Sequence, residues 1–236
     1  MGILNKFMSW YHGDNEIEKE PPRSGIKRVA YILINHTGEL VLVNVLFLLC
    51  CIPVITIPAA LTALNRYLIK ILRIGYGFSL WDYIDEFKKS LLKGIFLGFV
   101  VGILCFYGYY LLSLANNFLP VVQQNMILGI GFGVLSLGIL LGAYTFVLGA
   151  MLDLPGRHLL KNAAILMIVE WKVSLLLEVT LWGIGFAMLA FAPYSIVLIL
   201  PLGFSTQQLL VCAIINPVVN RRIIEPYERR NCGTVS

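Results

Sequence analysis

The sequence is short of charged residues. Of its 236 residues only 13% are Asp, Glu, Lys or Arg, whereas 58% are hydrophobic, and the mean hydropathy is +0.82. Soluble domains carry charge on about 25% of their residues, because water covers their surface. The deficit all but excludes a soluble enzyme, a disordered chain and a nucleic-acid-binding chain, although the net charge is +5. The composition predicts an integral membrane protein whose surface mostly faces lipid.

The sequence also lacks the motifs that catalysis, nucleotide binding and metal binding require. Its three histidines have no partner at zinc-ligand spacing, and none of its five cysteines forms a CxxC pair. No GxSxG nucleophile elbow and no glycine-rich phosphate loop occurs. The glycines of Gly129–Gly133 and of the GxxxG motif Gly98–Gly102 lie in apolar segments, where small residues typically permit close helix packing. We therefore expect neither an enzyme nor a bound cofactor or metal.

Long stretches without charge predict the membrane helices. One transmembrane helix takes about 20 apolar residues. The three uncharged stretches are Leu40–Asn65 with 26 residues, Gly94–Leu152 with 59 and Val179–Asn220 with 42. Each of the two longer stretches therefore holds two helices. These are expected near 94–114, 127–150, 174–192 and 196–220, with turns at the polar residues 115–126 and at 192–195.

Two prolines interrupt the first uncharged stretch. Pro53 and Pro58 each remove a helical hydrogen bond, and their rings clash with the preceding turn, so they predict a break. Such a break suits a hairpin, with one helix over about 28–52 and a second over about 58–74. The second helix carries Arg66, so we expect it to lie against protein, with the guanidinium reaching toward the membrane surface.

Positive charges predict the orientation, because cytoplasmic loops of membrane proteins are enriched in Lys and Arg. Residues 1–39 carry five such charges and residues 66–93 carry six, whereas the turns at 115–126 and 192–195 carry none. Both basic segments lie inside only if the proline-broken segment crosses the membrane twice. This favours six membrane helices with both termini in the cytoplasm. The alternative is five helices with the N-terminus outside.

The predicted architecture is an all-α, polytopic transmembrane helical bundle in the cell membrane. One helical domain over 28–220 lies between a cytoplasmic tail, 1–27, and a basic cytoplasmic tail, 221–236. Residues 82–93 are expected to form an amphipathic cytoplasmic helix that continues into the span beginning at Gly94. The lipid bilayer is the expected environment, and the basic tail is expected to contact anionic lipid rather than nucleic acid. The sequence leaves the oligomeric state open.

Few polar side chains interrupt the apolar segments. Glu178 is the one acidic residue within an expected span. An ionisable side chain in lipid costs about 2.5–3.5 kcal/mol, so Glu178 is a candidate for transport or coupling. The alternative is structural, because near a helix end its carboxylate reaches the headgroups or bonds Ser174 one turn back. Asn44, Gln207 and Gln208 are expected to join helices by hydrogen bonds or to line a polar path. A self-sufficient small transporter or channel is the function that Glu178, Gln207 and Gln208 would serve.

One segment combines an Asn, an apolar run, a Pro-x-x-Thr motif and small residues that end in Ala-Leu, and a Phe- and Lys-rich helix follows it. These features stand at Asn44, Pro53, Thr56, Pro58, Ala63, Leu64, Phe87 and Lys88. The pattern, over about 38–98, resembles the YesL family of bacterial membrane proteins. Pro58 stands where that family usually has Gly or Gly-Pro, which is a mild departure that keeps the break.

The resemblance implies a function only in outline. Genes of that family often lie beside those of ATP-driven (ABC), binding-protein-dependent sugar importers in Gram-positive bacteria. It therefore implies an accessory, non-enzymatic membrane subunit of an oligosaccharide ABC importer, with the permease subunits as partners. No catalytic residue comes with the resemblance. The candidate partner-contact or structural positions are Pro53, Thr56, Pro58, Phe87 and Lys88.

Overall fold

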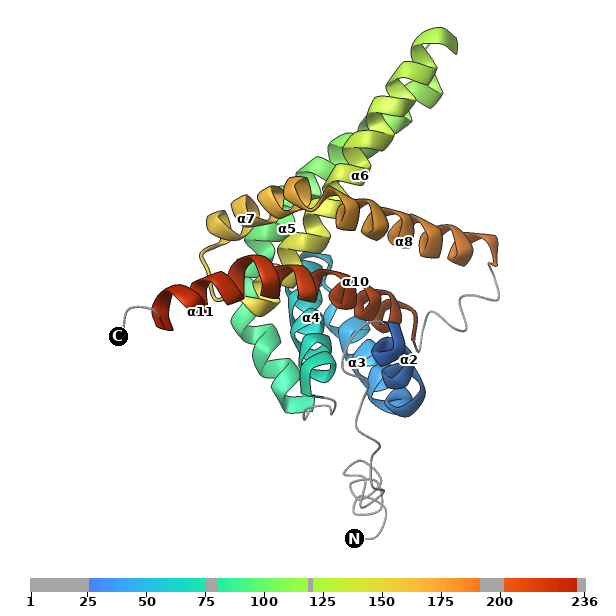
Figure 1. Cartoon of the computed structure of the whole chain (residues 1–236). Coiled ribbons are helices and arrows are strands. Elements are labelled where there is room, and N and C mark those ends of the chain that lie inside the picture. Colours follow the sequence, from blue (N-terminus) through green and yellow to red (C-terminus); the bar gives the residue numbers. More distant parts are fainter. Residues whose placement is uncertain (1–25, 75–79, 119–120, 192–201, 233–236) are drawn as a thin grey trace.

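The structure, a computed structural model, describes residues 26–74, 80–118, 121–191 and 202–232 (Figure 1). Within these ranges every regular element is a helix, so the predicted all-α class is confirmed. In chain order the elements are α2 (Ile26–Asn35), α3 (Thr37–Cys50), η1 (Val54–Thr56), α4 (Ile57–Ile74), α5 (Leu80–Phe118), α6 (Val121–Met151), α7 (Gly156–Val169), α8 (Trp171–Ala190), α10 (Phe204–Val219), η3 (Asn220–Ile224) and α11 (Glu225–Cys232).

Four helices, α4, α5, α6 and α8, are long and apolar enough to cross a membrane, and the bent pair α2–α3 raises the number to five if the pair is one span. The finding supports a helical membrane protein, whereas six spans are not confirmed. The described part of the sixth expected helix, α10, has 16 residues. The helix continues past Val219, but η3 and α11 add Arg221, Arg222 and further charged residues, so the added length is not apolar.

The predicted continuous helix over 28–52 is wrong, because the chain bends by 83° between α2 and α3. His36 leaves the helical conformation, with φ −111° and ψ 26°. The Thr37 hydroxyl donates a 2.5 Å hydrogen bond to the Leu33 carbonyl, which the Thr37 backbone N–H would otherwise use in a continuous helix. Glu39 in the first turn of α3 favours a new helix N-terminus there. Since no proline marks the bend, the proline rule did not find it.

Helix α5 has 39 residues and joins the expected amphipathic helix over 82–93 to the following span without a break, as predicted. The expected turn over 115–126 is shorter than predicted, because α5 continues to Phe118 and α6 starts at Val121. The Asn and Gln side chains of this region therefore belong to helices. Asn and Gln are tolerated in a helix, and Pro120 lies outside the described residues.

Figure 1 shows α5 and α6 side by side as a long hairpin whose tip projects beyond the other helices. The row α7–α8 and the row α10–α11 run crosswise to this hairpin, and α4 lies between the base of the hairpin and α10. The four long apolar helices therefore do not share one direction.

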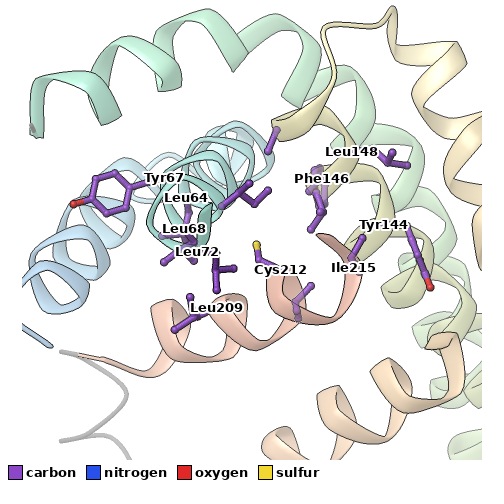
Figure 2. Close-up of a cluster of buried hydrophobic side chains, with 14 of the residues drawn as sticks. Leu64, Tyr67, Leu68, Leu72, Tyr144, Phe146, Leu148, Leu209, Cys212 and Ile215 are labelled. Atoms are coloured by element: carbon purple, nitrogen blue, oxygen red, sulfur yellow. The ribbon is translucent and has the colours of Figure 1, made fainter. Parts of the chain in front are cut away.

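Helix α4 lies at the centre of the core. Of the 18-residue apolar stretch that makes α4 a candidate span, 56% is buried inside the protein. The corresponding stretches of α5, α6 and α8 are only 17%, 22% and 11% buried. Figure 2 shows Leu64, Leu68 and Leu72 of α4 facing Leu209 and Cys212 of α10. The expectation that the helix carrying Arg66 lies against protein is confirmed. The exposed sides of α5, α6 and α8 are apolar, as lipid or another membrane protein requires.

Glycines allow the helix backbones to approach closely. A Cβ on Gly94 would lie 2.6 Å from the Ala59 Cα, and one on Gly98 would lie 2.0 Å from the Pro58 ring, so α5 rests directly on the start of α4. Gly108 approaches the α6 backbone at Leu135 in the same way. The predicted packing role of Gly98 is confirmed.

Not all glycines of the predicted packing motifs lie against another helix. In Gly129–Gly133, only Gly131 packs against another helix. A Cβ on Gly102, Gly129 or Gly133 would meet nothing within 4 Å.

Replacing Gly94 by Ala should destabilise the protein, whereas Gly102→Ala should not. Both substitutions raise helix propensity equally, so their difference isolates the clash with the Ala59 backbone. We expect the Gly94 variant to lose about 1–3 kcal/mol relative to the Gly102 variant, as overpacked cores do. Thermal unfolding in detergent measures the difference. Equal melting temperatures would show that α4 and α5 can separate without cost.

Candidate functional site

The break between α3 and α4 is closed by the Thr56 side chain. Its hydroxyl lies 2.6 Å from both the Cys50 and the Pro53 carbonyl oxygens, and its N–H donates to the Pro53 carbonyl at 2.9 Å. Thr56 therefore provides hydrogen-bond donors to carbonyls at and just beyond the end of α3, where helical partners are missing. Pro58 falls in the first turn of α4, where a proline needs no N–H partner.

An apolar groove of about 400 Å³ opens beside this break. Val54, Ile55 and Pro58 form one wall. The other wall belongs to α5 and contains Ile95, Gly98, Phe99, Gly102, Ile103 and Phe106. Because nothing lies within 4 Å of a Cβ on Gly102, the groove is open at that glycine.

The amphipathic start of α5 turns its apolar face inward. Tyr83 is buried and its hydroxyl donates a 3.3 Å hydrogen bond to the Ala60 carbonyl. Phe87 is half-buried against the core, whereas Lys88 is exposed. This face packs on α4, so the outer side, which carries Lys88 together with the exposed Trp81 and Leu92, is left for a lipid surface or a partner.

Polar contacts fasten α10 to α3 and α4. The Asn44 side chain is fully buried, and its Oδ1 accepts the backbone N–H of Ser205 at 2.9 Å. The Cys212 thiol donates to Oδ1 of the buried Asn65 at 3.3 Å. Beyond them, the Arg73 guanidinium donates to the side-chain oxygens of Asn216 and Asn220, at 3.1 and 2.8 Å. The expectation that Asn44 joins helices by a hydrogen bond is confirmed.

Glu178 lies on α8 and faces α6. The Trp182 indole N–H, one turn further along α8, lies 2.7 Å from Glu178 Oε1 and 3.1 Å from the Ser136 hydroxyl of α6. The Trp182 ring also stacks on Phe132 of α6 at a centroid distance of 4.5 Å. Glu178 Oε2 is buried and has no hydrogen-bond partner among the described residues. Glu178 Oε1 therefore has a hydrogen-bond partner, whereas Oε2 has none among the described residues.

Of the two structural alternatives for Glu178, the bond to Ser174 does not form. Ser174 instead donates to the Met167 carbonyl at 2.8 Å and pairs with the Tyr144 hydroxyl at 3.0 Å. Gln207 and Gln208 are half-buried on α10. Within the described ranges no hydrogen bond joins either of them to Glu178, so no polar contact links the three residues of the transport hypothesis.

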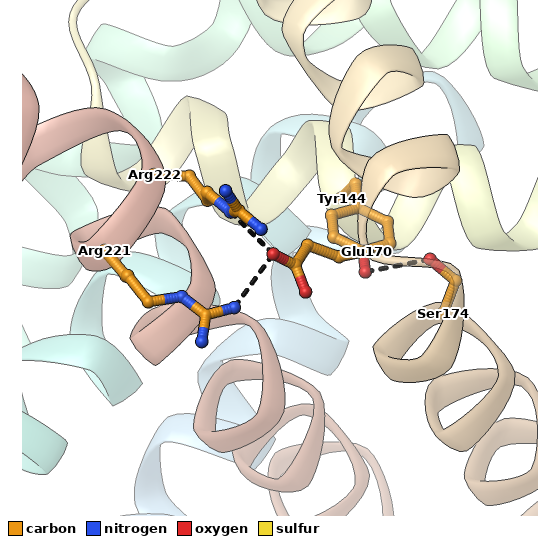
Figure 3. Close-up of polar contacts among 5 residues, drawn as sticks. All are labelled: Tyr144, Glu170, Ser174, Arg221 and Arg222. Atoms are coloured by element: carbon orange, nitrogen blue, oxygen red, sulfur yellow. Dashed lines mark hydrogen bonds and ion pairs between the residues drawn. The ribbon is translucent and has the colours of Figure 1, made fainter.

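A carboxylate that the sequence analysis missed stands at the break between α7 and α8. Glu170 Oε1 accepts from Arg222 Nε at 2.6 Å and from Arg221 Nη2 at 2.8 Å, and its side chain is 11% exposed (Figure 3). The Arg222 bond, with the second bond and the charge of Arg221, holds the pKa of Glu170 below its ordinary value. The contact joins η3 to the start of α8, and Tyr144 and Ser174 lie beside it.

Replacing Glu170 by Gln should loosen η3 and α11, because two guanidinium groups lose their charged acceptor. We expect faster amide hydrogen exchange over residues 220–232. The matched control is Glu225→Gln, which removes an exposed 3.6 Å pair with Arg229 and should change little. Equal exchange in the two variants would contradict the role of Glu170.

The Glu170 contact also has a predicted pH dependence. A lowered pKa means that the stabilisation is complete above the ordinary glutamate pKa of about 4.3. It is lost as the pH falls through the lower pKa of the folded state. The difference in melting temperature between the wild type and Glu170→Gln should therefore shrink below about pH 4.3. A constant difference over that range would show that charge is not its cause.

Comparison with known proteins gives one match. Residues 40–111 match the model of a family described as "Protein of unknown function, DUF624". The match runs from α3 through the break and α4 into the upper part of α5, so it contains the groove and the Gly94 and Gly98 contacts. No curated protein and no solved structure matches the chain.

Proposed function

We propose that the chain is a non-enzymatic accessory subunit of the cell membrane that docks on the permease subunits of an ABC importer for oligosaccharides. The apolar groove beside the Pro53–Pro58 break carries this proposal, because it offers a site for a helix of the permease. The carbohydrate importer comes from the resemblance to the YesL family. The excess of Lys and Arg in 66–93 and 221–236 supports a cytoplasmic C-terminus.

The groove suits a helix because glycine exposes the α5 backbone there. In lipid, burial of apolar surface gives little drive for association, so close backbone contact at small residues decides which helices meet. Gly102 offers such an approach, because no atom of the described residues lies within 4 Å of a Cβ built there. The exposed rings of Phe99 and Phe106, at 68% and 70%, add contact area along the same face.

A side chain placed at Gly102 should block docking without disturbing the fold. Gly102→Leu fills space that is open in the protein, and Gly133→Leu does the same on α6, away from the groove. We expect the wild type and the Gly133 variant, purified in mild detergent from the bacterium that encodes them, to recover permease and ATPase subunits near one-to-one. The Gly102 variant should recover less than about a tenth as much, because the leucine occupies the helix contact. Unchanged melting temperatures confirm that both variants fold.

Recovery of the wild type alone, or equal recovery with Gly102→Leu, would contradict the proposal. Mass spectrometry of the recovered subunits distinguishes an importer from other membrane partners. Cells that grow on several oligosaccharides are the right source, because importer subunits are made when their substrates are present.

A self-sufficient transporter is the second candidate function, and Glu178 favours it. A carboxylate oxygen that is buried without a partner at membrane depth is costly, and such groups often bind or relay ions. Against this, the bond from Trp182, which also bonds Ser136 of α6, gives the group a structural role. No hydrogen bond within the described ranges joins it to Gln207 or Gln208.

Liposomes separate the two candidates. The first proposal predicts that purified protein moves no labelled oligosaccharide under a pH gradient, and that Glu178→Gln leaves growth on oligosaccharides unchanged. Uptake that Glu178→Gln abolishes would favour the transporter instead. The control is Glu225→Gln, because this glutamate lies on α11 outside the candidate spans.

A further inference from the structure

A second cavity, of about 240 Å³, lies where α4, α5 and the start of α7 meet, and its wall is polar. The glycines Gly94 and Gly149 contribute no side chain to this wall. The polar lining residues are Thr62 and Arg66 of α4, Lys89, Ser90 and Lys93 of α5, and Asp153 between α6 and α7. None of the residues that line this cavity lines the apolar groove.

Cations outnumber carboxylates around the cavity. Three cationic side chains, Arg66, Lys89 and Lys93, face two acids, Glu86 and Asp153. Only the Arg66–Glu86 pair, at 3.1 Å, is within hydrogen-bond length. The other pairs, Lys89–Glu86, Lys93–Asp153 and Arg66–Asp153, are all 3.9 Å long. The lysine ammonium groups therefore keep N–H donors for an anion.

The Ser90 hydroxyl completes the donor set of the cavity. Ser90 is 6% exposed and its hydroxyl is available as a donor to a ligand. Thr62 is 5% exposed and donates its proton to the Pro58 carbonyl at 2.9 Å, so its oxygen can only accept. Asp153 lies at the mouth of the cavity. Its side chain is 79% exposed, so it can turn away from Lys93 when a ligand enters.

We infer that this cavity binds the phosphate group of an anionic ligand. A guanidinium, two ammonium groups and a hydroxyl are the donors that phosphate oxygens accept best. A phosphate monoester carries close to two negative charges near neutral pH, and it replaces Asp153 as the counter-ion of Lys93 and Arg66. A carboxylate ligand would bring one charge and compete less well with Asp153. The phosphate belongs either to a soluble ester or to a lipid headgroup.

Glycerol 3-phosphate and phosphatidic acid carry the same phosphate monoester and separate these sources. The full-length protein in phosphate-free detergent is titrated with glycerol 3-phosphate by calorimetry at constant ionic strength. In a second arm its melting temperature is compared in nanodiscs of phosphatidylcholine with and without phosphatidic acid. Binding in the first arm identifies a soluble ester, and a rise in melting temperature in the second arm alone identifies a lipid headgroup.

Three variants test the residues. Replacing both Lys89 and Lys93 by Gln should weaken whichever ligand binds by at least about tenfold, because two charge-assisted hydrogen bonds are lost. Lys88→Gln removes one positive charge from an exposed neighbour outside the cavity and should weaken binding less than about twofold. Asp153→Asn should strengthen binding, because it removes the competing carboxylate. This gain cannot arise from misfolding.

The proposal is overturned if neither glycerol 3-phosphate nor phosphatidic acid binds. It is also overturned if Lys88→Gln weakens binding as much as the double variant, since the charge of the surface alone would then explain it. The same holds if Asp153→Asn leaves the affinity unchanged. None of these measurements depends on a permease, so this site and the partner proposal can fail independently.

Discussion

The close contact between α4 and α5 is the constraint on which most of the structure depends. Gly94 and Gly98 leave no space for even a methyl group between α5 and the residues Pro58 and Ala59. This contact places α4 inside protein, where it forms the floor on which α10 packs. Because apolar burial gives little drive for helix association in lipid, fit between backbones has to supply what a hydrophobic core supplies in water.

Polar contacts then decide how the later helices attach to this pair. Asn44 receives an N–H from the start of α10, and Asn65 receives the Cys212 thiol further along the same helix. Glu170 holds the two arginines that follow α10. Each of these contacts joins segments far apart in the sequence. A helix bundle in lipid gains orientation from such contacts, since an unsatisfied polar group there is costly.

The sequence predicted those features whose cause is local. Composition indicated membrane helices, because lipid demands apolar side chains, and Pro53 and Pro58 indicated a break, because proline acts on its own turn. The bend at His36 was not predicted, because it depends on the Thr37 hydroxyl, a group that every threonine carries. Glu178 was predicted from its charge, and its partner Trp182 lies at i+4, the spacing that places two side chains on one helix face. Glu170 was missed because its partners lie 51 and 52 residues away.

The unbroken length of α5 has a mechanical consequence. Its lysines line the polar cavity, and Gly102, further along the same helix, lies at the groove. At 1.5 Å per residue, Lys93 and Gly102 are separated by about 14 Å along one stiff axis. At about 100° per residue, the lysines and Gly102 lie on opposite flanks of the α5 face that contacts α4. A rotation of α5 about its axis that carries the lysines away from α4 would therefore carry Gly102 toward α4 and its wall of the groove. A phosphate in the polar cavity and a helix in the apolar groove, as proposed above, would therefore both act on this one rotation of α5.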